Sequence, residues 1–206
     1  MGNNTIPRAN QIKIILSFVI VAIIITLIII FRSDLFRFNN NITDSERFYK
    51  EYNKTPVSNV YKYVTTKEAI ELFESKSAAV LFGFKDCKWC QSYVPVLDEV
   101  AKENGVDTVY YCNIFEDRKE NTEDYQKLVK LLEKYLYDDE QGNKRIYVPD
   151  VYFIKDGKIV GHNNDTSTKQ GTDTEEYYTL HKEELKTKLT DLFKKIGRSC
   201  NDTKGC

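Results

Sequence analysis

The sequence lacks a charge imbalance and internal repeats, and it contains only two histidines. Its 206 residues carry 30 basic and 31 acidic side chains, a formal net charge of −1. Because no basic stripe stands out, nucleic acid is not an expected partner. We find no internal repeat and no low-complexity tract. With 41% hydrophobic residues, most of the chain is expected to fold.

Charged residues are absent from one long apolar segment near the N-terminus. Only three residues of 14–31 are not strongly apolar. Such a run can cross a hydrocarbon core about 30 Å thick. A buried soluble helix would keep a polar stripe, and a cleaved signal peptide would have a shorter apolar region followed by a small-x-small site. We therefore expect an N-terminal tail (1–13) and an uncleaved single-pass membrane anchor (14–31).

The remaining chain predicts a linker (32–56), one α/β domain (57–197) and a short C-terminal tail (198–206). A capping box formed by Thr65 and Glu68 predicts the start of the first helix of the domain. Hydrophobic periodicity gives the order α, β, α, β, α, β, β, α. Parallel strands with helical crossovers followed by a hairpin predict a mixed central sheet flanked by helices. The expected strands begin near residues 78, 106, 147 and 159, and the expected helices near 65, 87, 122 and 175.

Two cysteines separated by two residues form the most informative motif, Cys87-Lys88-Trp89-Cys90. They follow a buried apolar run directly and begin a helical pattern. Helix N-terminal N–H groups and the nearby Lys88 should stabilise Cys87 as a thiolate, the nucleophilic form. Cys90, one turn inside the helix, suits the role of resolving thiol.

Three alternatives to a reactive dithiol are a zinc site, a structural disulfide and the chance spacing of two buried thiols. A zinc site would need a second pair of ligands. The only histidines, His162 and His181, have no metal-binding spacing to the other cysteines. No metal and no cofactor are therefore expected beyond the dithiol itself.

The motif and the residues after it resemble the active-site helix of thioredoxins. Pro95 lies five residues after Cys90, as in that family, and the stretch around Val148-Pro149-Asp150 resembles the family's cis-proline strand. The resemblance covers about residues 64–197 and implies a thioredoxin fold and thiol–disulfide oxidoreductase activity. It also implies that Pro149 is cis and that Val148 offers backbone hydrogen bonds to a substrate, with Trp89 and Asp150 beside them.

Several residues depart from the thioredoxin pattern. Lys88-Trp89 replaces the family's Gly-Pro, and Leu81 replaces the buried acid that helps to deprotonate the second cysteine. Asp150 is a candidate substitute base, although a solvated turn residue is the preferred interpretation. A further similarity is to bacteriocin transport accessory type thioredoxin-like proteins of low-GC bacteria.

Three cysteines lie outside the motif. Cys112, in an apolar strand, is expected to be a buried inert thiol. Cys200 and Cys206 are candidates for a structural disulfide, which endures in an oxidising space. A shuttle of electrons from this pair to the dithiol is the alternative. Basic residues flank both ends of the anchor and give no orientation, so this pair favours a domain outside the cytoplasm.

Two functional hypotheses follow. The first is a membrane-tethered oxidoreductase that exchanges thiols and disulfides with exported proteins and is recharged by a redox partner. The second is a non-catalytic accessory protein that binds a client, such as a secreted peptide, and has a static disulfide. The reduction potential discriminates between them, because a structural disulfide lies below about −300 mV.

Overall fold

The computed structural model describes Thr26 and residues 42–164 and 173–197. The chain divides into two compact units, residues 1–43 and 44–206. Apart from Thr26, the predicted anchor (14–31) lies outside the described residues, and so does the predicted tail (198–206). Within the described part of the chain, no helix is long and apolar enough to cross a bilayer.

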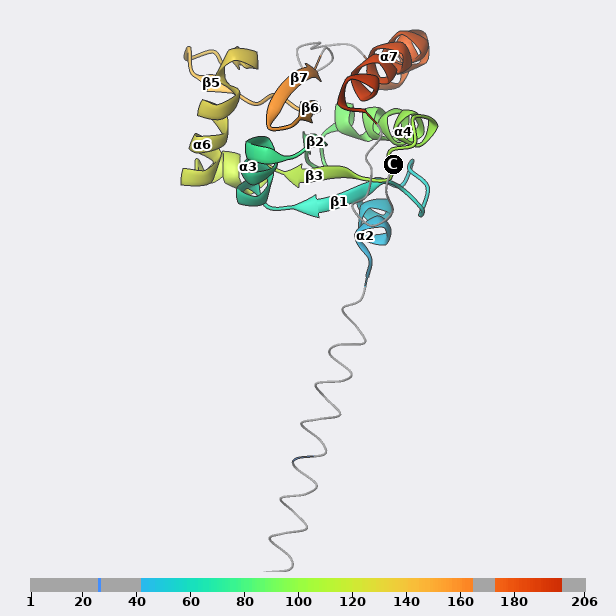
Figure 1. The fold of residues 1–206 in the computed structure, drawn as a ribbon, viewed down its shortest axis with the longest axis horizontal. Coiled ribbons are helices and arrows are strands. Elements are labelled where there is room, and N and C mark those ends of the chain that lie inside the picture. Colours follow the sequence, from blue (N-terminus) through green and yellow to red (C-terminus); the bar gives the residue numbers. More distant parts are fainter. Residues whose placement is uncertain (1–25, 27–41, 165–172, 198–206) are drawn as a thin grey trace, which may run out of the picture. The chain divides into compact units, whose positions relative to one another are not determined.

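A five-stranded mixed sheet forms the centre of the second unit (Figure 1). Its strand order is β1-β3-β2-β6-β7. The first three strands are parallel to one another, whereas β6 is antiparallel to β2 and β7 is antiparallel to β6. This mixed α/β arrangement, with helices on the sheet, fits a thioredoxin fold. The strands are β1 (Tyr61–Val64), β2 (Ala78–Gly83), β3 (Val109–Asn113), β6 (Asp150–Lys155) and β7 (Lys158–Asn163).

Strand β2 and the β6–β7 turn follow from local sequence. All six residues of β2 are buried because the strand lies in the middle of the sheet with helices on both faces, so its sequence is continuously apolar rather than alternating. The turn between β6 and β7 has positive φ at Asp156 (49°) and Gly157 (73°), the pattern of a type I′ hairpin. Both predictions from the sequence are confirmed.

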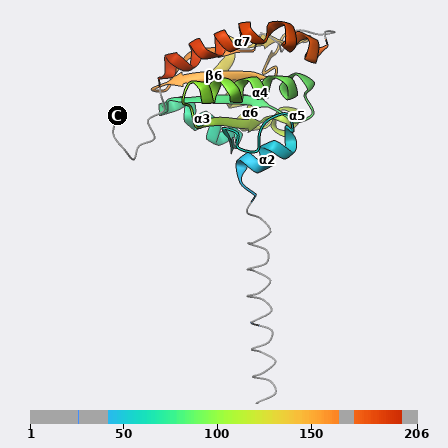
Figure 2. The same ribbon diagram turned by 90° about the vertical axis from the view of Figure 1, so that its right-hand side faces the viewer.

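Helices cover both faces of the sheet (Figures 1 and 2). Helix α7 lies along α4 on one face and also contacts β6 and β7, while α3 and α6 pack together on the other face. The capping box of Thr65 and Glu68 begins α3 as predicted. The helices are α2 (Asp44–Glu51), α3 (Thr66–Ser75), α4 (Lys88–Glu103), α5 (Phe115–Glu120), α6 (Glu123–Leu132) and α7 (Thr174–Ile196), with a 3-10 turn η1 (Glu133–Tyr135).

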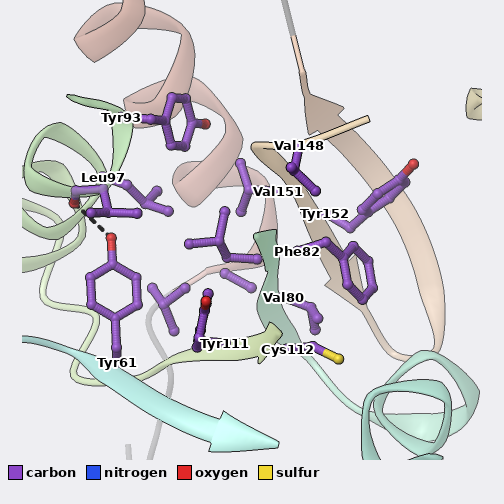
Figure 3. Close-up of a cluster of buried hydrophobic side chains, with 14 of the residues drawn as sticks. Tyr61, Val80, Phe82, Tyr93, Leu97, Tyr111, Cys112, Val148, Val151 and Tyr152 are labelled. Atoms are coloured by element: carbon purple, nitrogen blue, oxygen red, sulfur yellow. Dashed lines mark hydrogen bonds between the residues drawn. The ribbon is translucent and has the colours of Figure 1, made fainter. Parts of the chain in front are cut away.

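The core lies on both sides of the sheet (Figure 3). Tyr61 and Leu97 lie on the α4 side, where the Tyr61 hydroxyl donates to the carbonyl of Val94 at 2.7 Å. Phe82 and Tyr152 lie on the α3 side with ring centroids 5.8 Å apart. All of these except Val94 are large side chains that are at most 3% exposed.

The structure differs from the sequence prediction in residues 44–56, which were expected to belong to the linker. Helix α2 occupies Asp44–Glu51, and Phe48 and the following Tyr52 are both fully buried. The folded region therefore begins near Asp44. With only eight residues, α2 is too short to show a sustained hydrophobic period.

Four further elements were not expected from the sequence. The edge strand β1 and the short helix α5 each have at most six residues. The segment after η1 contains a small hairpin, formed by β4 (Tyr137–Asp138) and β5 (Lys144–Arg145). Short elements such as these carry too few residues for a periodic signal.

Candidate functional site

The dithiol lies where β2 ends and α4 begins. Cys87 is the N-cap residue of α4, with extended backbone angles (φ −81°, ψ 111°). Its sulfur accepts a hydrogen bond from the backbone N–H of Cys90 at 3.2 Å. Both cysteines are free thiols; Cys87 is partly exposed, whereas Cys90 is 1% exposed. Only the first sulfur is therefore open to a partner.

The surroundings of Cys87 lower the pKa of its thiol. The hydrogen bond from the Cys90 side chain is the largest cause, and the backbone N–H groups of Cys90 and Trp89 act in the same direction. Burial opposes this lowering, and the positive charge of Arg118 adds to it. Helix N-terminal N–H groups and a nearby cation are the features that favour a thiolate.

Cys90 has the opposite electrostatic environment. Burial raises the pKa of its thiol well above the usual value, and the hydrogen bond to Cys87 raises it further. Cys87 therefore ionises at a lower pH than Cys90. This asymmetry gives Cys87 the chemistry of an attacking thiol and Cys90 that of a resolving thiol.

The segment before β6 lies against the dithiol. The Cys87 thiol donates a hydrogen bond to the carbonyl oxygen of Val148 over 3.7 Å. The Val148–Pro149 peptide bond is cis, the geometry that the thioredoxin resemblance implies. The sequence motif at 87–90 and the motif at 148–149 are thus brought together.

Arg118 is a site residue that sequence reasoning missed. It lies in α5, which begins after β3, and the backbone N–H of Ile114 bonds the Gly83 carbonyl at the end of β2. This places α5 at the same edge of the sheet as the dithiol. The Arg118 guanidinium lies 5.0 Å from the centre of the Phe84 ring and donates to the Ile146 carbonyl over 3.4 Å. No sequence motif marks Arg118, because its position depends on strand pairing.

Lys88 and Trp89, between the two cysteines, have different environments. The Lys88 side chain is exposed. The sequence predicted Lys88 as the cation near Cys87, whereas the structure adds Arg118, whose charge lowers the Cys87 pKa. Trp89 is partly buried, with edge-on contacts to Tyr177 and Tyr178 of α7 at centroid distances of 5.4 and 5.9 Å. Trp89 therefore connects the dithiol to α7.

Asp150 differs from its preferred interpretation as a solvated turn residue. Its side chain is 0% exposed, and burial raises the pKa of its carboxyl to about 6. Its oxygens face His162 Nδ1 at 3.2 Å and Asn164 Nδ2 at 3.5 Å. A side chain enclosed in this way is not available to a substrate.

The substitute-base interpretation of Asp150 also meets a geometric obstacle. Asp150 pairs directly with Phe82, and paired residues of antiparallel strands point to the same face of the sheet. The next residue, Gly83, faces the other way, where a Cβ would lie 3.5 Å from the Cys90 sulfur. Asp150 and Cys90 therefore lie on opposite faces of the sheet.

The sequence also made predictions for the three other cysteines and for Leu81. Cys112 is fully buried beside Thr66, and burial raises the pKa of its thiol to about 12. Cys200 and Cys206 lie outside the described residues. Leu81, at the position of the thioredoxin acid, is fully buried. In the part of the chain that the structure describes, no three His, Cys, Asp or Glu side chains gather as a metal site.

Comparisons with known proteins give matches among solved structures only. No family model matches the chain, and no curated protein matches it. Thioredoxin O1 from Arabidopsis thaliana, in the oxidised state, is 19% identical over 61% of this chain and 97% of its own, with a TM-score of 0.35. Thioredoxin O2 from the same plant, also oxidised, is 15% identical over 63% of this chain and 96% of its own, with a TM-score of 0.36.

Proposed function

We propose that this chain is a membrane-tethered thiol–disulfide oxidoreductase that acts on extracytoplasmic proteins through Cys87 and Cys90. The observation that carries the proposal is the asymmetry of the dithiol. Cys87 is partly exposed at a helix N-cap with a lowered pKa, and Cys90 is buried behind it with a raised pKa. A static structural disulfide would need no such difference between its two sulfurs.

The proposed exchange proceeds in two balanced steps. The Cys87 thiolate attacks a disulfide of the partner, forms a mixed disulfide and releases one partner sulfur as a thiolate, which takes up a proton. Cys90 then loses its proton and attacks the Cys87 sulfur, forming the Cys87–Cys90 disulfide and releasing the second partner sulfur as a thiol. The reverse sequence oxidises a partner dithiol, and the reduction potential relative to the redox partner sets the direction.

Substitution of the resolving thiol tests the proposal. Cys90→Ser should hold the mixed disulfide, because the second step has lost its nucleophile. The full-length variant, expressed in cells and separated on non-reducing gels, should carry protein partners that a reductant releases. Cys87→Ser is the matched control and should capture none. Equal capture by both variants, or by neither, contradicts the assigned roles.

The membrane tether and the location are supported by the sequence. Residues 14–31 form the apolar segment, and Cys200 with Cys206 suit an oxidising compartment. The non-catalytic accessory hypothesis is separated from the proposal by the equilibrium of the purified chain with glutathione. A dithiol with a potential below about −300 mV would support the accessory role.

A further inference from the structure

A pair of buried tyrosine hydroxyls lies beside the dithiol. Tyr52 follows α2 and Tyr111 belongs to β3, and both side chains are 0% exposed. Their hydroxyl oxygens are 2.8 Å apart, and their rings meet edge-on at 5.7 Å. The two residues are 59 positions apart in the chain, so only the tertiary fold brings them together.

The position of Gly83 shows how close this pair is to Cys90. A Cβ on Gly83 would lie 3.3 Å from Tyr111 Cε2, 3.5 Å from Cys90 Sγ and 3.6 Å from Tyr52 Oη. The Cys90 sulfur and the Tyr52 hydroxyl therefore border one small space on the α4 side of the sheet. Negative charge on Cys90 would raise the pKa of both phenols, which shows that they share its electrostatic environment.

The hydroxyl pair has one proton to spare. Two phenols carry two protons, and their mutual hydrogen bond uses one of them. For residues 42–164 and 173–197, the structure shows no other hydrogen-bond acceptor for either hydroxyl. Burial raises the pKa of both tyrosines far above the usual value, so both remain neutral donors. A neutral donor without an acceptor is suited to an anion that forms nearby.

We propose that Tyr52 donates a hydrogen bond to the Cys90 sulfur when that sulfur becomes a thiolate, and that Tyr111 positions Tyr52 by donating to its oxygen. This inference rests on the proposed function. It assigns a charge-stabilising role in the resolving step to a residue from the segment that the sequence placed in a linker. Tyr52 thereby supplies a buried polar group, whereas Leu81, at the position of the thioredoxin acid, supplies none.

The chemistry of the resolving step explains the need for such a donor. Cys90 must give up its proton in a buried position, where an unpaired negative charge is costly. The Cys90–Cys87 bond then forms, the bond from Cys87 to the partner breaks, and the partner sulfur leaves and takes up a proton. Tyr52 and Tyr111 keep their protons throughout. Hydrogen bonds to charged groups are stronger than those between neutral groups, so the pair acts mainly while Cys90 is ionised.

Stopped-flow fluorescence of the detergent-solubilised full-length chain tests the inference. Trp89 is the only tryptophan, so its emission reports on the adjacent dithiol. The reduced chain is mixed with oxidised glutathione at concentrations where the rate no longer rises, so that resolution by Cys90 is measured. Tyr52→Phe should slow resolution about tenfold at neutral pH and move its pH midpoint upward, the change expected for losing a hydrogen bond to a charged group. The second-order attack by Cys87 should be unchanged.

Two further substitutions and one control complete the test. Tyr111→Phe should have the same effect but a smaller one, and Gly83→Ala should slow resolution because its methyl group enters the space that Tyr52 Oη and Cys90 Sγ border. Tyr61→Phe is the matched control, since it removes a buried hydroxyl from the same cluster, bonded to the Val94 carbonyl at 2.7 Å. It should leave the pH profile unchanged.

The outcomes separate this inference from the proposed function. Suppose that the unsubstituted chain forms the Cys87–Cys90 disulfide and that Tyr52→Phe and Tyr111→Phe both show the same pH profile of the resolving rate as that chain. The inference is then wrong and the oxidoreductase proposal stands. If the original chain never forms the Cys87–Cys90 disulfide, both are wrong. If Tyr52→Phe does not fold, as judged by its circular dichroism, Tyr111→Phe and Gly83→Ala decide the question.

Discussion

Only two residues separate Cys87 from Cys90, yet the fold gives their sulfurs different solvent exposure, hydrogen bonds and neighbouring charges. At the N-cap, Cys87 meets two backbone N–H groups, whereas Cys90 lies in the core. The cation in this environment comes from α5, whose Arg118 is held by the Phe84 ring and the Ile146 carbonyl. Reactivity at this scale therefore depends on which groups surround each sulfur.

Replacement of Arg118 should make Cys87 less reactive at neutral pH. The charge of Arg118 lowers the Cys87 pKa, so Arg118→Gln should move the pH midpoint of Cys87 alkylation upward. The rate of iodoacetamide labelling, measured against pH and located by mass spectrometry, gives the midpoint. Lys88→Gln removes a cation beside Cys87 in the sequence and serves as the control. A larger effect of Lys88→Gln would show that the sequence neighbour dominates.

Asp150 should make stability fall as the pH rises from about 4 to about 6. Burial raises the carboxyl pKa from 3.8 to about 6, so in this range the folded state binds more protons than the unfolded state. The contribution of Asp150 is then fully favourable below the unfolded pKa and is lost as pH rises through the folded value. Urea unfolding at several pH values should show a shallower fall for Asp150→Asn. An identical pH dependence of the two chains would contradict this.

At the scale of elements, short helices decide what the site contains. Helix α2 brings Phe48 and Tyr52 into the core, where Phe48 stacks on Tyr61 with centroids 3.8 Å apart. Helix α5 likewise brings Arg118 to the dithiol. Both helices have eight residues or fewer. Tertiary packing rather than helix propensity must stabilise elements of this length.

The burial of Phe48 gives a direct test that α2 belongs to the folded domain. Phe48→Ala should lower the free energy of unfolding by about 3–5 kcal/mol, the usual cost of truncating a buried aromatic side chain. Tyr49→Ala, at the next position, is the matched control, because Tyr49 is 39% exposed and should change stability by less than about 0.5 kcal/mol. Urea denaturation measures both. Similar values for the two variants would place α2 outside the core.

The sequence predicted those parts of the site that depend on neighbouring residues. Strand β2, the dithiol and α4 are continuous in the chain, and a buried apolar run followed by a helical pattern marks them. Tyr52, Tyr111 and Arg118 could not be found in this way. These side chains lie near Cys90 and Cys87 only because β1, β2 and β3 pair in parallel and α2 packs against β1. Such long-range contacts leave no local pattern.

The same limit explains the error over Asp150. A polar residue after a proline is usually a turn residue, and the local sequence offered no contrary signal. Its burial follows from pairing with Phe82 in the middle of the sheet and from the side chains of β7, including His162. These partners are 68 and 12 residues away in the chain. Only the assembled sheet reveals that Asp150 is enclosed.

At the scale of the whole molecule, the chemistry depends on the compartment that residues 32–206 occupy. The same dithiol would oxidise partners in an oxidising compartment and reduce them in a reducing one. The reduction potential of the compartment decides whether the dithiol is reoxidised or reduced again after each exchange. The apolar segment 14–31 predicts a tether, and the charges at its two ends do not orient it. Cys200 and Cys206 are the sequence feature that favours the outer side.

Labelling of Cys87 in intact cells tests this location. After mild reduction, a maleimide that cannot cross membranes should modify Cys87 in cells that express the full-length chain, because Cys87 is partly exposed. Cys112 should stay unmodified while the domain is folded, since it is fully buried. A Cys87→Ser chain controls for labelling of Cys200 and Cys206, and cells lysed before labelling give the maximum signal. Modification of Cys87 only after lysis would place the domain inside the cell, where the reducing poise would make this chain a reductase.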